Sequence, residues 1–217
     1  MMYTTVIFDL DGTLLDTLGD LCDAVNTALS AHGHPQRTIE EIRRFVGNGI
    51  RSLVARSLPC GEDTPHFEEI LADFRAYYAA HAEVKTAPYA GVRELLLRLR
   101  EAGVRVAVVS NKFESAVEAL CRRYFDDLVE VAIGDRPDRA RKPAPDGVYA
   151  ALASLGEGKE SAVLVGDAET DVATARAAGI PCVAVLWGFR DRDQLTEAGA
   201  TCFAETADEL EKILLGA

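Results

Sequence analysis

The sequence predicts an α/β protein: a doubly wound parallel sheet that carries a small inserted four-helix domain. Five short apolar runs rich in Val and Ile show no alternation of apolar and polar residues, which is the pattern of parallel strands covered on both faces. Helical segments separate the last four runs, and this order indicates right-handed crossovers. Residues 17–85 contain no strand-like run, which predicts a helical insertion after the first strand.

The five expected strands are, in chain order, Thr4–Phe8, Val104–Val109, Val129–Ile133, Ala162–Val165 and Cys182–Leu186. Apolar residues at helical spacing predict helices between and after the later strands, in residues 92–99, 116–121, 148–155, 171–178 and 206–214. Glycines at positions 103, 156 and 179 are expected to end three of these helices. The pattern Thr206-x-x-Glu209 is a capping box that begins the last one.

The insertion is expected to contain four amphipathic helices, with apolar faces in residues 18–29, 39–45, 50–58 and 67–78. Thr38-x-x-Glu41 caps the second helix, and Thr64-Pro65 begins the fourth. We therefore expect residues 1–16 and 86–217 to form an α/β core and residues 17–85 to form a helical cap. The chain crosses twice between the two, and such a pair of crossings can act as a hinge.

Composition restricts the partners of this chain. Its net charge is −12, from 23 Lys and Arg against 35 Asp and Glu, so its surface repels nucleic acid and anionic membranes. We see no pattern of a signal peptide or of a membrane span. The five cysteines are odd in number and far apart, and we expect all of them to be small buried side chains in a reducing cytoplasm. Monomer and homodimer both remain open.

Polar residues follow four of the expected strands. In an open parallel sheet, ligands bind at the carboxyl ends of the strands, so the residues at those ends are the candidates for chemistry. These residues are Asp9-Leu10-Asp11-Gly12-Thr13, Ser110-Asn111-Lys112, Arg141-Lys142-Pro143 and Gly166 to Asp171. Each has a structural alternative, as a turn, a helix cap or a surface lysine, but their joint placement at one edge indicates a site.

The acidic residues of this set suit a hard cation. Asp9 and Asp11 are two residues apart in extended chain, so their side chains point to the same side, where they suit a divalent cation or a shared proton. Asp167 ends a strand, and Asp171 lies in the first turn of the next helix. Together these oxygens fit Mg²⁺. Gly12 lets the backbone turn sharply and approach a ligand closely.

A phosphate in so acidic a pocket needs positive charge and hydrogen-bond donors besides the metal. Ser110 and Lys142 supply them, and Asn111 is a further candidate.

These four motifs resemble those of the haloacid dehalogenase superfamily and, within it, the phosphoglycolate-phosphatase-like branch. The first motif, Asp-x-Asp-Gly-Thr, matches Asp9–Thr13, and the second, a Ser or Thr, matches Ser110. The third, a Lys before Pro, matches Lys142, and the fourth, Gly-Asp-x-x-x-Asp, matches Gly166–Asp171. The resemblance covers essentially the whole chain and implies a Rossmann-like core with a helical cap.

The resemblance also implies a Mg²⁺-dependent phosphatase that acts on a small phosphorylated metabolite. Asp9 would attack phosphorus to form an aspartyl phosphate, and Asp11 would protonate the leaving alcohol and later take a proton from water. Mg²⁺ would be held by Asp9, the backbone carbonyl of Asp11 and Asp167, with Asp171 beside it. The residues expected to bind the phosphate are Gly12, Thr13, Ser110, Asn111 and Lys142.

One segment of the insertion bears on the substrate. Phe45-Val46-Gly47-Asn48-Gly49 resembles the Val/Ile-Gly-Asn-Gly segment of phosphoglycolate phosphatases, whose cap loops help to choose substrates. Asn48 and Arg51 are therefore candidate substrate contacts; the alternatives are a turn that uses Gly and Asn for their backbone freedom and a solvated arginine. Ala168 departs from the Ser that members of this branch often carry there.

Other functions remain open at this point. A phosphomutase of β-phosphoglucomutase type, a pyrophosphatase and a non-catalytic binding protein would use the same scaffold. A haloacid dehalogenase would share Asp9 but would have no need for Asp11 or Mg²⁺. A dinucleotide-binding domain is disfavoured, because no Gly-x-Gly-x-x-Gly follows the first strand.

Overall fold

A six-stranded parallel sheet is the main element of the computed structural model, which describes residues 3–216. The strand order is β5-β4-β1-β6-β7-β8, and every adjacent pair is parallel. The strands are β1 (Thr5–Phe8), β4 (Arg105–Phe113), β5 (Val131–Asp135), β6 (Ala162–Gly166), β7 (Cys182–Val185) and β8 (Phe203–Ala204). The predicted α/β class with a doubly wound parallel sheet is confirmed.

The chain divides into two compact units. The core unit consists of Met1–Leu15 and Pro88–Ala217, and the helical unit consists of Asp16–Ala87. The chain passes between the units at β2 (Leu15–Asp16) and β3 (Ala87–Pro88), and these two short strands pair with each other.

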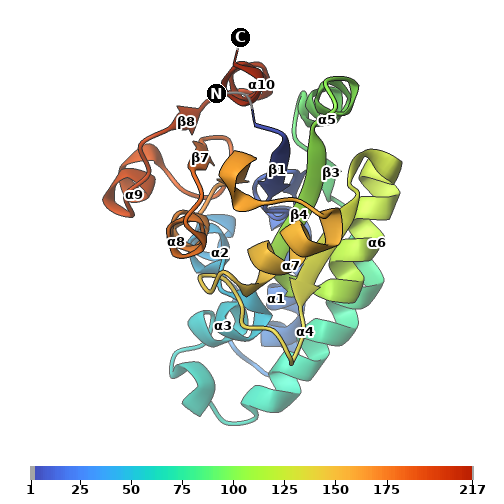
Figure 1. Cartoon of the computed structure of the whole chain (residues 1–217). Helices are drawn as coiled ribbons and strands as arrows, with labels where there is room; N and C mark the ends of the chain where they lie inside the picture. The colour runs from blue at the N-terminus through green and yellow to red at the C-terminus, as the bar shows by residue number, and fades with distance from the viewer. Residues whose placement is uncertain (1–2, 217) are drawn as a thin grey trace. The chain divides into compact units, whose positions relative to one another are not determined.

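Helices cover both faces of the sheet in the core unit (Figure 1). The helices are α5 (Val92–Glu101), α6 (Glu114–Phe125), α7 (Asp146–Leu155), α8 (Glu169–Ala178), α9 (Arg192–Glu197) and α10 (Ala207–Leu215), with short 3₁₀ turns η2 (Asp126–Leu128) and η3 (Lys159–Ser161). Side chains of a strand alternate between its faces. Val6 and Phe8 therefore pack with α5, α6 and α10, whereas Ile7 packs with α7 and α8.

Several details of the core unit differ from the sequence prediction. Strand β8 and helix α9 were not predicted, because a two-residue strand and a six-residue helix carry too little periodicity to be recognised. Strand β4 continues beyond Val109 to Phe113, and its pairing with β5 shifts register between these two residues. The prediction that all five cysteines are buried was wrong: Cys121 is buried, but Cys60 is exposed.

The helical unit contains α1 (Leu18–Ala31), α2 (Ile39–Phe45), α3 (Gly49–Arg56), the 3₁₀ turn η1 (Gly61–Asp63) and α4 (Phe67–His81). The predicted capping box of α2 is present: Glu41 N donates to Thr38 Oγ1 at 3.2 Å, and Thr38 N donates to Glu41 Oε2 at 2.8 Å. Helix α4 begins at Phe67, later than the predicted Thr64-Pro65.

One buried carboxylate joins the start of the helical unit to its end. Asp20, in the first turn of α1, accepts hydrogen bonds from Lys85 N at 2.9 Å and from Thr86 N at 2.9 Å. The Thr86 hydroxyl donates to the same carboxylate at 2.8 Å. Asp20 is 2% exposed, so its buried carboxylate needs these donors in place of water.

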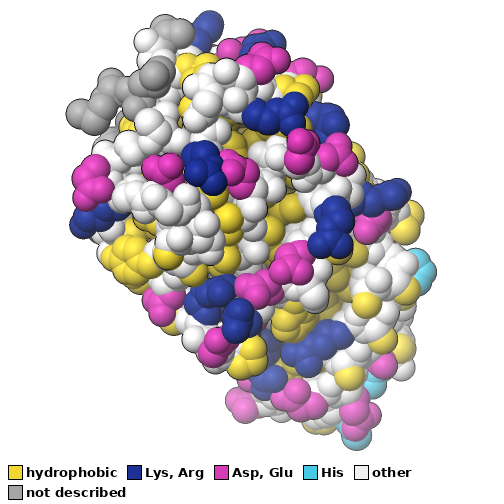
Figure 2. All heavy atoms as spheres, turned by 45° about the vertical axis from the view of Figure 1, so that its right-hand side comes forward, with side chains coloured by type: hydrophobic (Ala, Val, Ile, Leu, Met, Phe, Trp, Pro, Cys, Tyr) yellow, Lys and Arg dark blue, Asp and Glu magenta, His cyan; other side chains and the backbone are white. Residues whose placement is uncertain are grey.

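The surface carries charges of both signs. Figure 2 shows basic side chains beside acidic ones at several places on the face that it draws. Ion pairs of the surface include Arg105–Glu130 and Arg100–Asp127. Within residues 3–216, no helix combines the length and the apolar character that a membrane crossing needs.

Candidate active site

The first carboxylate of the site stands at the carboxyl end of the central strand β1. Asp9 N donates to Val165 O at 2.9 Å, which continues the pairing of β1 with β6. Its side-chain Oδ1 accepts from Leu10 N at 2.7 Å and lies 2.9 Å from Lys142 Nζ. The carboxylate is therefore held in one orientation by a backbone amide and an ammonium group.

A second carboxylate, Asp167, follows the neighbouring strand β6. Thr13 Oγ1 donates to its Oδ1 at 2.9 Å, and Phe189 N donates to its Oδ2 at 2.7 Å. Asp167 is 1% exposed. Two loops, those after β1 and β7, thus fix this side chain.

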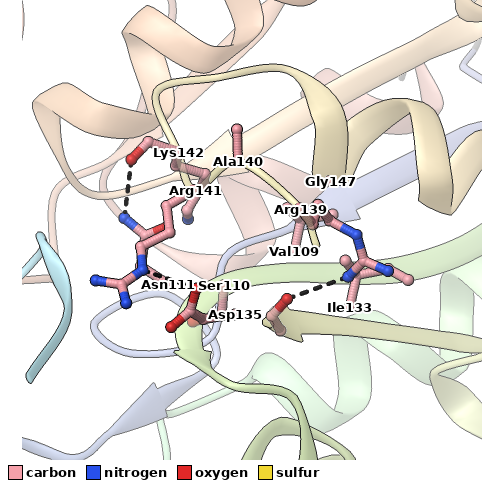
Figure 3. A pocket seen from close by; sticks show the side chains of 11 residues that line it. Val109, Ser110, Asn111, Ile133, Asp135, Arg139, Ala140, Arg141, Lys142 and Gly147 are labelled. Atoms are coloured by element: carbon pink, nitrogen blue, oxygen red, sulfur yellow. Dashed lines mark hydrogen bonds and ion pairs between the residues drawn. The ribbon is translucent and has the colours of Figure 1, made fainter. Parts of the chain in front are cut away.

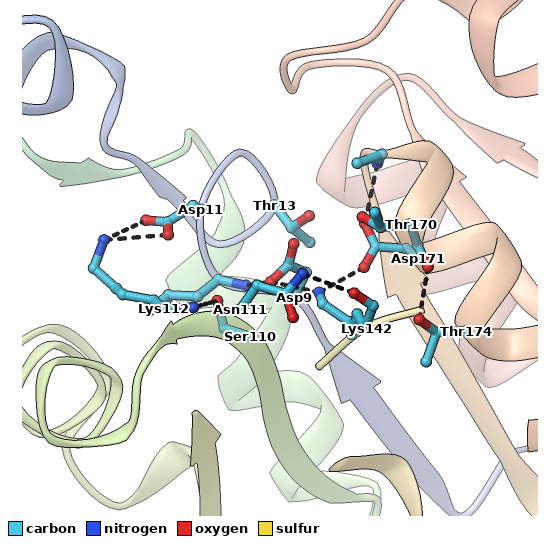
Figure 4. A network of polar contacts seen from close by, with 12 residues as sticks. Asp9, Asp11, Thr13, Ser110, Asn111, Lys112, Lys142, Thr170, Asp171 and Thr174 are labelled. Carbon is cyan, nitrogen blue, oxygen red and sulfur yellow. Dashed lines mark hydrogen bonds and ion pairs between the residues drawn. The ribbon is translucent and has the colours of Figure 1, made fainter. Parts of the chain in front are cut away.

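The third carboxylate, Asp171, lies in the first turn of α8. Its Oδ2 accepts from Ala168 N at 3.0 Å, as an acidic side chain at a helix N-terminus commonly does. Its Oδ1 accepts from Lys142 Nζ at 2.7 Å. Lys142 therefore bridges Asp9 and Asp171, and Figure 4 shows the three side chains converging.

Asp9, Asp167 and Asp171 have the composition and spacing of a cation site. One carboxylate oxygen from each lies within 4.8 Å of the others, and all three residues are buried. Hard divalent cations such as Mg²⁺ prefer oxygen ligands of this type. The single ammonium group of Lys142 cannot balance three ionised carboxylates, so a divalent cation fits the charge of the cluster as well as its donor atoms.

The electrostatics of the cluster lead to the same conclusion. Burial raises the pKa of Asp9 from its ordinary value of 3.8 to about 7, with Lys142 opposing the rise and Asp171 adding to it. Burial also raises the pKa of Asp167 to about 8, and the charges of Asp171 and Asp9 add to that rise. For Lys142, burial alone would lower the pKa, but the charges of Asp171 and Asp9 raise it. The protein thus holds carboxylates whose ionisation needs a further positive charge.

Glycines leave the room that this packing requires. A Cβ on Gly12 would lie 2.3 Å from Asp167 Oδ2, and a Cβ on Gly166 would lie 2.2 Å from Asp171 Cγ. A Cβ on Gly188 would meet Asp167 Cβ at 2.3 Å. Gly12 also has φ = +86°, a conformation that favours glycine.

Ser110 and Asn111 lie on the last part of β4, beside the loop that carries Lys142. Asn111 Nδ2 donates to Lys142 O at 3.1 Å, which ties strand and loop together. These residues line a pocket together with Asp135 and Arg141, which form an ion pair at 2.7 Å (Figure 3). Ser110, Asn111 and Lys142 therefore border one cavity of the core unit, whereas the other two candidate phosphate-binding residues, Gly12 and Thr13, are not among its lining residues.

Asp11 takes a different position from the other three acidic residues. Its carboxylate accepts from Lys112 Nζ at 2.9 Å and 3.1 Å. Figure 4 shows the Lys112 side chain extending away from the Lys142 group to reach it. Among residues 3–216, the carboxylates of Asp9, Asp167 and Asp171 form the acidic cluster, and the Asp11 carboxylate does not belong to it. The expected contribution of Asp11 to a metal site, through its backbone carbonyl, stays a prediction.

The two candidate substrate contacts of the insertion belong to the helical unit. Asn48 directly precedes α3, between Gly47 and Gly49, whose φ values are +122° and +79°. Arg51 Nη2 lies 2.7 Å from Glu62 Oε2 and 2.7 Å from Glu68 Oε1. In this conformation Arg51 is engaged in ion pairs within its own unit, and its role toward a substrate stays a prediction.

Sequence reasoning missed four contributors to the site. Lys112 was noted only as the end of the Ser110-Asn111-Lys112 segment, and the roles of Trp187, Gly188 and Phe189 were not recognised. Trp187 Nε1 donates to Thr13 O at 2.9 Å, and this loop follows β7. Applying the rule that ligands bind at the carboxyl ends of strands to the fifth strand would have pointed to this loop.

Comparison with known proteins gives one family. A family model described as haloacid dehalogenase-like hydrolase matches residues 6–185 of this chain. A phosphoglycolate phosphatase of Pseudomonas syringae pv. tomato is 34% identical to it, over 97% of this chain and 78% of that protein. A phosphoglycolate phosphatase of Mesorhizobium japonicum is 36% identical, over 86% of this chain and 84% of that protein.

A solved structure shares the whole fold. A protein of Lactobacillus delbrueckii subsp. bulgaricus, assigned only provisionally as a phosphoglycolate phosphatase, superposes with a TM-score of 0.95. It is 36% identical and covers 100% of both chains.

Proposed function

The chain belongs to the haloacid dehalogenase-like hydrolase family, and from that premise we propose that it is a Mg²⁺-dependent phosphatase that hydrolyses small phosphate monoesters through a phosphorylated Asp9. One observation carries the proposal above the others: Lys142 bridges Asp9 and Asp171 in a cluster that includes Asp167, all at the carboxyl ends of the parallel strands. The proposed nucleophile Asp9, the proposed phosphate-binding ammonium group of Lys142 and the proposed metal ligands then lie in one site.

Asp9 is the proposed nucleophile. It is the residue of the cluster that follows the central strand, and Leu10 N and Lys142 Nζ both hold its Oδ1. A carboxylate fixed in this way loses little freedom when it attacks, because its orientation is already set. Lys142 and Ser110 would bind the nonbridging phosphate oxygens, with Asn111, Gly12 and Thr13 around them.

The reaction has two steps. In the first, an oxygen of Asp9 forms a bond to phosphorus, the bond from phosphorus to the ester oxygen breaks, and that oxygen takes a proton from Asp11 and leaves as the alcohol. In the second, a water molecule gives a proton to Asp11, its oxygen bonds to phosphorus, and the bond to Asp9 breaks. Inorganic phosphate leaves, and Asp9 and Asp11 return to their first states.

Asp9, Asp167 and Asp171 would hold the Mg²⁺ ion, together with the backbone carbonyl of Asp11. When bound, the ion supplies positive charge that offsets the repulsion between a carboxylate nucleophile and a phosphate dianion. The residues of the chain have the other roles: Leu10 N and Lys142 orient Asp9, Asp11 transfers the proton, and Lys142 and Ser110 bind the phosphate.

The substrate is proposed from the relatives. The proteins from Pseudomonas syringae and Mesorhizobium japonicum are named phosphoglycolate phosphatases, and this chain spans most of each of them. We therefore propose 2-phosphoglycolate or a similarly small anionic phosphate monoester. The helical unit would serve as a cap, with Asn48 and Arg51 as candidate substrate contacts. We propose the cytoplasm as the location, where such metabolites are found.

A screen of phosphorylated metabolites with Mg²⁺, including 2-phosphoglycolate, tests the proposal. Release of inorganic phosphate is expected from the wild type, and Asp9→Asn is expected to abolish it while circular dichroism shows an intact fold. The exposed Asp193→Asn is the matched control and should keep full activity. Wild-type turnover in Asp9→Asn, prepared without deamidation, would remove the proposed nucleophile, and a wild type that hydrolyses no monoester would remove the function.

A further inference from the structure

A second buried lysine lies at the same edge of the sheet as Lys142. Lys112 is on the last part of β4, and its side chain is only 4% exposed. Its Nζ contacts both carboxylate oxygens of Asp11, at 2.9 Å and 3.1 Å, and the Asp11 side chain is 16% exposed. The backbone amide of Lys112 donates to Ser110 Oγ at 3.3 Å, which helps to fix the strand segment that bears it.

Burial of this ammonium group needs an explanation. Lysine is almost never fully buried unless it is paired, and removing an ion from water costs several kcal/mol. Pairing with a carboxylate recovers that cost only when the geometry is good, and here both oxygens of Asp11 are engaged. An apolar pair at these positions would stabilise a fold as well, so stability alone does not account for the pair.

The two lysines contact different acidic residues. Lys142 contacts Asp9 and Asp171, which belong to the cation cluster. Lys112 contacts Asp11, whose carboxylate lies outside that cluster, and Figure 4 shows the Lys112 side chain extending in the opposite direction. Each lysine therefore fixes an acidic side chain that has its own task in the proposed reaction. Lys142 fixes Asp9, which attacks phosphorus, and Lys112 fixes Asp11, which transfers the proton.

We propose that Lys112 is a positioning residue, which holds the Asp11 side chain where its carboxyl group, when protonated, can deliver a proton to the departing ester oxygen. This inference rests on the proposed function and goes beyond it, since the contact of Lys112 is with Asp11, whose carboxylate lies outside the cation cluster. Its physical basis is the sensitivity of proton transfer to distance, because a misplacement of about 1 Å can cost on the order of 100-fold in rate.

The leaving group provides the test. A strongly basic alkoxide, as from 2-phosphoglycolate, needs a proton when it departs, whereas the weakly basic nitrophenolate of p-nitrophenyl phosphate does not. The measured quantity is kcat/KM, because it reports only the steps up to loss of the alcohol, and the later hydrolysis of phosphorylated Asp9 does not enter it. Lys112→Met keeps the length of the side chain and removes its charge.

We expect Lys112→Met to lower kcat/KM for 2-phosphoglycolate by roughly 100-fold and that for p-nitrophenyl phosphate by less than about 5-fold. The loss should fall mainly on kcat, because the proposed role of the lysine is in the proton-transfer step and not in binding of the substrate. Lys112→Arg keeps a cation and should recover part of the alkyl phosphate activity. The exposed Lys159→Met is the control and should match the wild type.

A double-mutant cycle keeps the test decisive even if Lys112→Met folds poorly. That variant removes this partner from the partly buried Asp11 carboxylate, whereas Asp11→Asn with Lys112→Met leaves neither charge of the pair. If Lys112 acts only through Asp11, the double variant and Asp11→Asn should have the same kcat/KM for 2-phosphoglycolate within about 3-fold. Thermal melting of every variant shows which of them are folded.

Each contrary result has its own meaning. Equal losses with both substrates, no loss with either, a change confined to KM, or a further loss in the Asp11→Asn background would each overturn the positioning role. Failure of the proposed function would look different, because it would appear in the wild type or in Asp9→Asn and would not depend on Lys112.

Discussion

The acidic cluster predicts that the metal-free protein loses stability as pH rises, and that Mg²⁺ restores it. The perturbation is chelation of divalent cations at about pH 5.5 and about pH 8, in the wild type and in Asp167→Asn. In the unfolded chain, Asp9 and Asp167 release their protons near the ordinary pKa of 3.8, whereas burial raises the folded pKa values to about 7 and about 8. Between these limits the folded state binds more protons than the unfolded state, so stability falls with rising pH.

The magnitude follows from the pKa values. One pKa unit corresponds to about 1.4 kcal/mol, and Asp167 keeps its proton over roughly 2.5 pH units between the two conditions, which gives about 3 kcal/mol. Asp9 keeps its proton over roughly 1.5 of those pH units, which adds about 2 kcal/mol. The repulsion between the Asp9 and Asp167 carboxylates raises both pKa values, so the combined loss of stability stays below about 5 kcal/mol. For a chain of this size, 3 kcal/mol corresponds to roughly 6–12 °C in Tm.

Thermal unfolding with chelator or with Mg²⁺, at both pH values, is the assay. The Tm of the metal-free wild type should fall more steeply with pH than that of Asp167→Asn, and the difference between the two proteins isolates the cluster from other titrating groups. Because cations bind ionised carboxylates, the rise in Tm with Mg²⁺ should be larger at about pH 8. Equal pH dependence in both proteins, or an equal effect of Mg²⁺ at both pH values, would refute the reasoning.

Two further predictions concern residues that support the site and the fold. Asp20→Ala should lower the free energy of unfolding by about 3 kcal/mol or more in urea titrations, since it removes an acceptor of Lys85 N, Thr86 N and the Thr86 hydroxyl. Asp23→Ala is the control and should cost less than about 1 kcal/mol, because the Asp23 side chain is 42% exposed in its ion pair with Lys85. Equal costs of the two substitutions would contradict the role of Asp20. Gly12→Ala should abolish the Mg²⁺-induced rise in Tm and most activity, because its Cβ would displace Asp167. Gly103→Ala is the control: its φ is also positive, at +75°, but no atom lies within 4 Å of its Cβ, so it should cost about 1–2 kcal/mol and keep both the response to Mg²⁺ and the activity. A Gly12→Ala protein whose Tm still rises with Mg²⁺ would argue against the close packing of Gly12 on Asp167.

The elements that the sequence determined are those with a local signal. Apolar runs without alternation located β1, β4, β5, β6 and β7, because a strand covered on both faces needs apolar side chains at every position. The capping box at Thr38 and the glycine after α8 likewise act within a few residues. Parallel strands place their carboxyl ends at one edge of the sheet. Because Asp9, Lys142 and Asp167 each follow an expected strand, their positions in the sequence also indicated that they would meet.

Only the tertiary structure decided how these side chains divide among partners. The sequence presents Asp9 and Asp11 as a pair, yet Asp9 joins Asp171 through Lys142, whereas Asp11 turns to Lys112. Asp167 is fixed by Thr13 and by the Phe189 amide, 154 and 22 residues away along the chain. Such choices depend on how segments that are distant in the sequence pack against one another, and no periodicity or local preference of the chain encodes them. Spacing along the sequence shows which residues reach the site, and packing in three dimensions selects the contacts that they make there.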